Sequence, residues 1–239
     1  SNGQVVVNIA KKTIMYKIIK QIFTLLIFSI VLFSCNSNQN KNNFEIREGD
    51  LFFQNTGTGE IDNAIKSVTA TKLSKNYSHV GIAMKKNEKW FVLEAIPKEG
   101  ICQTPLVKFL NRNKNKFNKS QTTVARLDNY YRAYISRAIN YGTERINTPY
   151  DDIFLWDDDS YYCSELVYKM FSSQDLPKDS IPFLKHPMTF NDSKGNPMPS
   201  WKNYYKIRNH PIPEGIEGTN PNLMASSPHI KFIYDYESE

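Results

Sequence analysis

Residues 161–171 read YYCSELVYKMF and place a cysteine where a helix is predicted to begin. On a helix that starts near Ser160, Cys163 lies in the first turn, and Leu166 and Val167 follow at i+3 and i+4 on the same, core-facing side. The free N–H groups and the positive dipole end of a first turn favour a thiolate. A buried cysteine that only fills space fits the same pattern. A nucleophile therefore requires a base nearby.

His79 is the histidine whose setting differs from that of the others. The chain has four histidines, and three of them stand beside prolines in loop-like segments: His186, His210 and His229. His79 opens the β-rich run SHVGIAM (78–84), and a second run, WFVLEAI (90–96), follows after a short polar linker. The two runs predict an antiparallel hairpin.

The predicted register of this hairpin makes His79 and Glu94 neighbours. If the turn is centred on residues 86–87, these two residues oppose each other, and a shift by one would put the carboxylate among apolar side chains. A carboxylate at one imidazole nitrogen leaves the other nitrogen free to take a proton from a thiol. A solvent-facing cross-strand pair is the alternative. The opposed pairs on the other face are apolar: Val80 with Leu93 and Ile82 with Phe91.

The remaining patterns predict one α+β domain. Residues beyond Pro177 are rich in Pro, Asn and Gly and are predicted to form extended covering segments. The pattern further predicts strands at 47–54 and 122–127 and helices at 59–70, 104–110, 129–146 and from about 161.

The basic excess of the chain lies at its N-terminus. Without residues 1–34 the chain has 26 basic and 24 acidic residues, and this near-neutral body argues against nucleic-acid binding. From Met15 a short basic region precedes an apolar run at 22–33, which is typical of a secretory signal and short for a bilayer span. The basic residues before Cys35 are Lys11, Lys12, Lys17 and Lys20.

The sequence Leu32-Phe33-Ser34-Cys35 resembles a bacterial lipobox. Residues 1–34 are therefore predicted to be a leader with a signal peptide from about Met15, and Cys35 to carry a lipid. Residues 35–45 are predicted to be a flexible tether before a domain at 46–239. An uncleaved membrane anchor is the alternative. Both interpretations place the domain at the cell envelope, membrane-anchored and facing the periplasm or on the outer membrane.

An exported domain lies in an oxidising compartment. A structural disulfide between Cys102 and Cys163 is therefore an alternative role for the two thiols. No metal or other cofactor is predicted. The acidic run at 157–159 lacks the glycine and distal glutamate of a calcium loop, and no Cys or His spacing matches a zinc site. Tyr161 and Tyr162 are predicted to pack near the thiol or to line a substrate cleft.

Six segments in this order resemble the YiiX/YebB-like family of permuted NlpC-type papain-like cysteine hydrolases, over nearly all of residues 46–230. The resemblance implies a circularly permuted papain-like α+β fold with an antiparallel sheet packed against helices. It implies that Cys163 is the nucleophile, His79 the general base and Glu94 the residue that orients the imidazole. One departure is Asn147-Thr148, where a glycine-containing turn is expected. The six segments are GDLFFQ (49–54), SHVGIAMKKNEKWFVLEAI (78–96), TPYDDIF (148–154), YYCSELVY (161–168), HPMTF (186–190) and PEGIEGTNP (213–221).

The expected function is that of an exported, lipid-anchored cysteine hydrolase, an amidase or peptidase that works through a thioester acyl-enzyme. The expected substrates are cell-wall peptides or acylated amino-acid or lipid amides. Two alternatives stay open: an acyltransferase, and a non-catalytic lipoprotein binding module that keeps the fold.

Overall fold

The computed structural model describes residues 44–56, 75–174, 176–177 and 180–238. The predicted leader, Cys35, most of the tether and the helix predicted at 59–70 lie outside these residues. Among the described residues, none of the helices has the length and apolar character needed to cross a bilayer.

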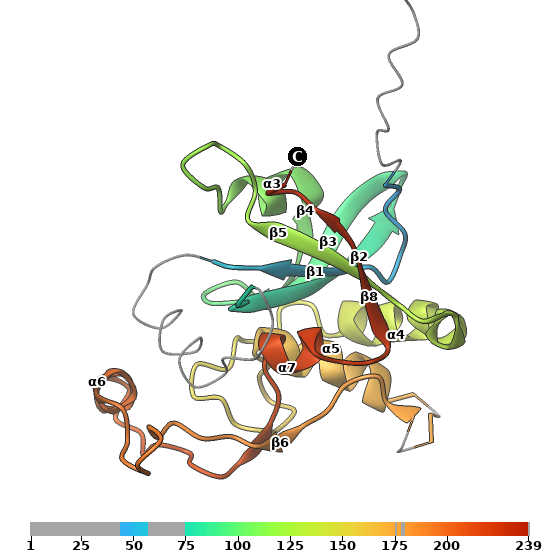
Figure 1. Ribbon diagram of the computed structural model, residues 1–239. Coiled ribbons are helices and arrows are strands. Elements are labelled where there is room, and N and C mark those ends of the chain that lie inside the picture. Colours follow the sequence, from blue (N-terminus) through green and yellow to red (C-terminus); the bar gives the residue numbers. More distant parts are fainter. Residues whose placement is uncertain (1–43, 57–74, 175, 178–179, 239) are drawn as a thin grey trace, which may run out of the picture. The chain divides into compact units, whose positions relative to one another are not determined.

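A six-stranded sheet in which all neighbours are antiparallel forms the centre of the domain (Figure 1). Its strand order is β4-β3-β2-β1-β5-β8. The antiparallel sheet of the α+β prediction is therefore confirmed, although β4 and β8 fall in stretches read as turn, helix start or covering segment. The strands are β1 Leu51–Gln54, β2 His79–Lys86, β3 Lys89–Ile96, β4 Gly100–Pro105, β5 Thr122–Leu127 and β8 Ile230–Asp235.

Helices cover both faces of this sheet. In Figure 1, α4 (Arg132–Glu144), α5 (Cys163–Ser172) and α7 (Pro221–Ala225) lie beneath it, and α3 (Leu106–Asn111) lies on the other side. A short 3-10 turn, Asn129–Tyr131, leads into α4. Helix α4 buries Ile135, Ala138, Ile139 and Gly142, which recur at helical spacing.

Separate apolar clusters occupy the two faces. The larger joins β-strand residues such as Leu51 and Ile82 to Leu166 and Met170 of α5. The cluster under α3 consists of Phe52, Ala83, Val92, Phe109 and Val124. Because both faces are covered, β1 is apolar at successive positions and does not alternate.

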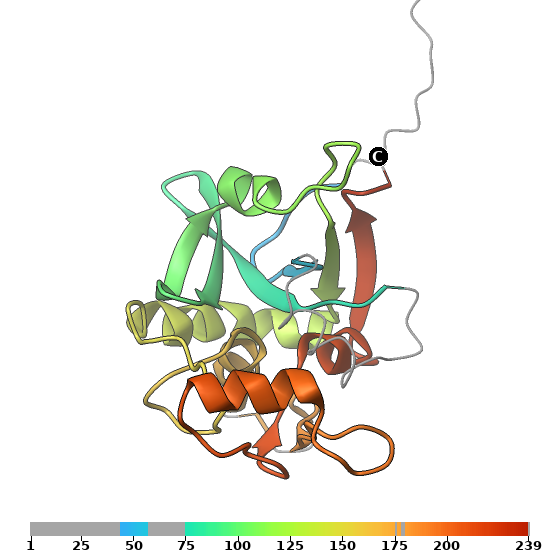
Figure 2. The ribbon, with the colours of Figure 1, turned by 90° about the vertical axis from the view of Figure 1, so that its left-hand side faces the viewer.

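A third cluster joins the segment after α5 to residues that precede α5. Helix α6 (Pro199–Ile207) lies beyond the helical layer, on the side away from the sheet, in both views (Figure 2). The short strands β6 (His186–Pro187) and β7 (Glu217–Gly218) of this segment pair with each other. The buried residues of this cluster are aromatic: Phe154, Tyr162, Phe190, Trp201, Tyr204 and Tyr205.

The β2–β3 register differs by two residues from the predicted one. Ile82 pairs with Leu93 and Met84 with Phe91, so the turn is centred on residues 87–88 and not on residues 86–87. A two-residue hairpin loop with a type I′ turn needs positive φ at both positions, and Asn adopts this conformation more readily than Lys. Asn87 and Glu88 have φ values of 48° and 59°. A shift by two residues leaves every side chain on its predicted face.

The connection from α4 to α5 runs closely along β4. Ile101 N–H donates to the Thr148 carbonyl at 2.9 Å, and a Cβ added to Gly100 would lie only 2.2 Å from that oxygen. Asn147 has a φ of 73° and thus adopts the left-handed conformation for which a glycine was expected. This turn leads the chain toward Tyr150 and the start of α5.

Candidate active site

Cys163 is the first residue of α5. Tyr162, the residue before the helix, is extended, and its N–H donates to the Glu165 carboxylate at 3.3 Å, which fixes the entry into the first turn. The Cys163 side chain belongs to the buried core, with 5% of the residue exposed. Its backbone N–H is in the first turn, where N–H groups have no intrahelical partner.

His79 and Glu94 form a buried pair on neighbouring strands. His79 Nε2 lies 2.6 Å from Glu94 Oε2, and the two residues are 7% and 0% exposed. Because Gly81 has no side chain, the imidazole reaches Glu94 across the ladder; a Cβ at Gly81 would lie 3.2 Å from Glu94 Cβ. The predicted contact is present, although it is diagonal, and it is buried under α3, not facing solvent.

The structure also brings Cys163 to this pair. The Cys163 sulfur is a hydrogen-bond partner of the His79 ring. Since Nε2 bonds to Glu94, Nδ1 is the nitrogen left for the sulfur. Burial disfavours a charged imidazole, but hydrogen bonds and charge attraction from Cys163 and Glu94 outweigh it and raise the pKa of His79 from 6.5 to about 9. The ring is therefore protonated at neutral pH.

Arg112 is a member of the site that the sequence did not reveal. Its guanidinium hydrogen-bonds to Glu94 Oε2. Burial favours the neutral carboxyl group, but His79 and then Arg112 outweigh it and hold the pKa of Glu94 below its usual value. In the sequence Arg112 stands among lysines, in NRNKNKFNKS (111–120), and only its identity as arginine separates it from a solvated basic run.

A cleft opens beside Cys163 between the start of α5 and the α6 segment. Tyr162 lines it, as predicted, whereas Tyr161 does not. Tyr150 also lines it, and burial raises the pKa of that phenol well above its usual value, so it stays protonated. The other lining residues are mainly apolar or hydroxylic and include Ser78, Phe154, Ser164, His186, Met188, Phe190, Trp201 and Thr219.

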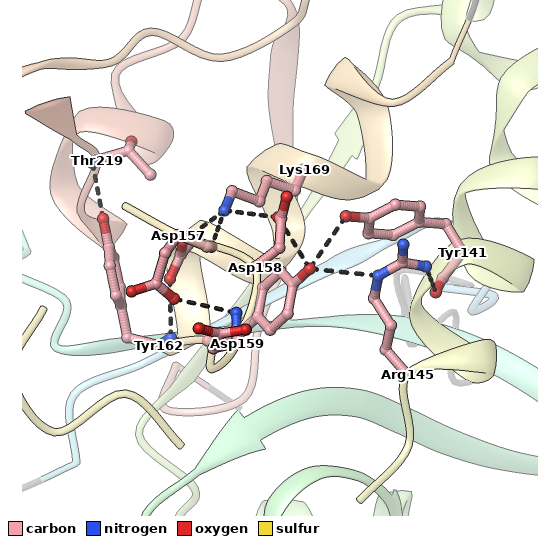
Figure 3. Close-up of polar contacts among 10 residues, drawn as sticks. Tyr141, Arg145, Asp157, Asp158, Asp159, Tyr162, Lys169 and Thr219 are labelled. Atoms are coloured by element: carbon pink, nitrogen blue, oxygen red, sulfur yellow. Dashed lines mark hydrogen bonds and ion pairs between the residues drawn. The ribbon is translucent and has the colours of Figure 1, made fainter. Parts of the chain in front are cut away.

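Tyr161 points into a polar network behind α5 instead. Its hydroxyl group donates to Asp158 Oδ1 at 3.1 Å and lies 3.2 Å from both Tyr141 Oη and Arg145 Nε (Figure 3). Consecutive residues of an extended segment face opposite ways, so Tyr161 and Tyr162 cannot both face the cleft. Of the two roles predicted for Tyr161, packing in the core that also holds Cys163 is therefore met, and lining the cleft is not.

Lys169 ties the acidic loop to α5. Its Nζ lies 2.9 Å from Asp158 Oδ1 and 2.8 Å from Glu165 Oε1 (Figure 3). Burial raises the pKa of Glu165 to about 8, even with Lys169 beside it. The acidic run at 157–159 thus holds its loop to α5 through the contact between Asp158 and Lys169. Within the described ranges, no group of three or more His, Cys, Asp or Glu side chains is arranged to hold a metal ion.

The cysteines of the domain are unpaired. Cys102 and Cys163 are both free, so the alternative of a disulfide between them is not met. Cys102 lies on β4 across from Glu94, with its Sγ 3.7 Å from Thr104 Oγ1. Of these two thiols, only Cys163 has an imidazole as a hydrogen-bond partner.

Comparisons with known proteins agree with this architecture. The model of a family described as "Permuted papain-like amidase enzyme, YaeF/YiiX, C92 family" matches residues 45–234. The uncharacterized protein YiiX of Escherichia coli K12 is 29% identical over 126 residues, which cover 52% of this chain and 57% of that relative. The chain thus matches little more than half of that relative's length.

A solved structure from Escherichia coli O157:H7, described as the metalloprotein YiiX, superposes with a TM-score of 0.63. It is 22% identical, and the match covers 80% of this chain and 98% of that one. This likeness concerns the fold alone.

Proposed function

The chain belongs to the YaeF/YiiX family of permuted papain-like amidases, and from this premise we propose that it is a cysteine amidase with Cys163 as nucleophile, His79 as general base and acid, and Glu94 as the group that orients the imidazole. One observation carries the proposal. It is the hydrogen-bonded line from Cys163 through His79 to Glu94 at the edge of the cleft.

The reaction follows from the charges of this line. The Cys163 thiolate attacks the carbonyl carbon of an amide, and the electron pair of the carbonyl moves to the oxygen. The His79 imidazolium then gives its proton to the leaving nitrogen as the C–N bond breaks, which leaves a thioester on Cys163. Neutral His79 next takes a proton from water, and the hydroxide oxygen displaces the sulfur and releases the acid.

The first turn of α5 is suited to stabilise the oxyanion. The Cys163 N–H lies at the positive end of the helix dipole, next to the sulfur that makes the new bond. A donor in that position follows negative charge as it develops on the carbonyl oxygen.

The lining of the cleft favours one of the two expected substrate classes. Aromatic and thioether side chains such as Phe154, Trp201 and Met188 suit a hydrocarbon chain, whereas a cell-wall peptide needs a larger share of charged and amide groups. The proposed substrates are therefore acylated amino-acid or lipid amides, with the acyl carbonyl at Cys163.

The proposed location is the cell envelope, with a lipid on Cys35. Support comes from the sequence alone: the basic start, the apolar run at 22–33 and the lipobox-like Leu32–Cys35. Metabolic labelling with a fatty-acid analogue tests it. Label should enter the wild-type chain and not the Cys35→Ala variant, and label that persists in the variant would contradict the proposal.

A thiol-reactive probe tests the proposed chemistry. We expect iodoacetamide to modify Cys163 at least ten-fold faster than Cys102 at pH 7, and His79→Ala to abolish most of this preference. Cys102→Ser is the matched control and should retain the fast phase. Equal, slow labelling of both thiols would instead favour the non-catalytic binding module.

A substrate series tests the acyl class. N-acyl amino-acid amides with chains of increasing length should be cleaved faster as the chain grows, and Cys163→Ala should abolish cleavage. A muropeptide that is cleaved faster than every acyl amide would refute the class while leaving the chemistry intact. Addition of an amine acceptor distinguishes an acyltransferase, since the acyl group would then appear on the amine.

A further inference from the structure

Arg112 and His79 share one oxygen of Glu94. Both the guanidinium and His79 Nε2 hydrogen-bond to Oε2, and Oε1 has no hydrogen-bond partner among the residues that the structure describes. The two cations are therefore no farther apart than two hydrogen-bond lengths. Each of them changes how strongly that oxygen attracts the other.

The position of Arg112 is fixed from several elements. Its Nε donates to Gln54 Oε1 at 3.2 Å, and its guanidinium lies 4.4 Å from the centre of the Phe109 ring in α3. Gln54, at the end of β1, is itself held: its Nε2 donates to the Phe109 carbonyl at 3.0 Å and to Thr122 Oγ1 at 2.9 Å. The Arg112 side chain is only 27% exposed. These contacts, and not burial, separate it from Lys114 and Lys116 of the same segment, since Arg112 as a whole residue is exposed as they are.

We propose that Arg112 is a positioning residue that keeps the Glu94 carboxylate charged and in place while His79 exchanges its proton with the substrate. The proposal rests on the proposed amidase function, because it assigns Arg112 a role in the proton cycle of that site. Arg112 acts through Glu94 and does not contact the reacting atoms.

The proton cycle explains why a second cation is needed. When His79 gives its proton to the leaving nitrogen, Glu94 loses its first counter-charge while fully buried, and an isolated buried carboxylate is strongly disfavoured. Arg112 supplies a charge that no step of the reaction removes. Because Arg112 repels the imidazolium, it also makes His79 a stronger acid than His79 would be if Glu94 were its only charged neighbour.

Among the residues that the structure describes, few other titratable groups lie near this pair. Cys163 is a partner of the imidazole, Tyr150 lies near Cys163, and Cys102 faces Glu94 from β4. Burial raises the pKa of the Tyr150 phenol and, together with Glu94, that of the Cys102 thiol, so both are neutral near pH 7. Arg112 is thus the lasting positive charge next to Glu94, and its removal is expected to raise the pKa of His79.

The test is an NMR titration of the His79 ring in the detergent-solubilised full chain. Arg112→Gln keeps donors but removes the charge, and we expect it to raise the His79 pKa by about one unit or more. Arg112→Lys keeps the charge and should change it by less than about half a unit. Lys114→Gln, two residues along, is the matched control and should leave it unchanged.

The outcomes separate this role from a structural one and from the amidase proposal. An unchanged or lowered His79 pKa in folded Arg112→Gln overturns the inference, and so does a full-unit rise in Arg112→Lys if the Gln variant does not fold. Iodoacetamide labelling of the wild-type chain is measured alongside. If Cys163 does not react faster than Cys102 there, the amidase proposal itself fails, whatever Arg112 does.

Discussion

Gly81 gives the sharpest link between packing and the proposed chemistry, and Gly81→Ala is expected to impair both. The added Cβ would lie 2.5 Å from Val92 Cγ1 and 3.2 Å from Glu94 Cβ. Val92 is β-branched and fully buried, so it has little freedom to move aside. Strand β3 must therefore shift, and Glu94 shifts with it.

The size of the effect follows from two opposing contributions. Overpacking of a core typically destabilises by about 1–3 kcal/mol, while replacing glycine lowers the entropy of the unfolded chain and returns about 0.4–1 kcal/mol. We expect a net loss of about 1–2 kcal/mol in the free energy of unfolding. Because displacing a reacting group by about 1 Å lowers rates by roughly a hundred-fold, Cys163 alkylation should slow by at least about ten-fold.

Urea unfolding and the rate of Cys163 alkylation by iodoacetamide measure the two effects. Gly142→Ala is the matched control, because its Cβ would meet Leu93 Cδ2 at 2.8 Å on the opposite face of β3. It should alter stability and leave alkylation nearly unchanged. Wild-type alkylation and unfolding in Gly81→Ala would refute the claim that the bare backbone at Gly81 sets the His79–Glu94 contact.

Three further results are expected. The raised pKa of His79 contributes stability that is fully present below pH 6.5, the ordinary pKa of histidine, and is lost as pH rises through about 9. Urea unfolding should therefore show a decline of about 3 kcal/mol in the free energy of unfolding across this window. The His79→Gln variant should not show this decline. Lys169→Met leaves the buried Glu165 without its cation, and because burial raises the pKa of Glu165 to about 8, the stability loss should be larger at pH 9 than at pH 6; the exposed Lys202→Met is the control, and an equal loss at both pH values would contradict the pairing. Glu94→Gln should lower the pKa of His79 by more than one unit in an NMR titration. An unchanged pKa would show that Cys163 is sufficient to keep the imidazole protonated and that Glu94 is not needed for it.

The parts of the fold that the sequence predicted are those with regular patterns. β2, β3 and β5 alternate or run apolar, and α4 and α5 have helical spacing, so periodicity was sufficient. β4 carries Gln103 and Thr104 and ends at Pro105, which reads as a helix start, and β8 follows a Pro- and Asn-rich stretch. Long-range pairing with β3 and β5 decides those two strands, and a single sequence does not display it.

The candidate site divides in the same way. The His79 and Glu94 face was predictable because side chains alternate along a strand, and an error of two residues in register preserves that alternation. Arg112 was not predictable, because its partners Gln54 and Glu94 come from distant strands. Which of Tyr161 and Tyr162 faces the cleft was left open for a local reason, because the direction of the residues before a helix depends on the path of the preceding loop.

The order of the site along the chain delays the reactivity that we propose for the sulfur. Along the chain, the hairpin that carries imidazole and carboxylate comes early, the helix that carries the thiol comes much later, and the last strand, which forms one edge of the sheet, comes at the very end. An unfinished or unfolded chain therefore exposes only an ordinary thiol. The onset of fast alkylation during refolding should therefore report when the helix that carries the thiol first packs against the hairpin.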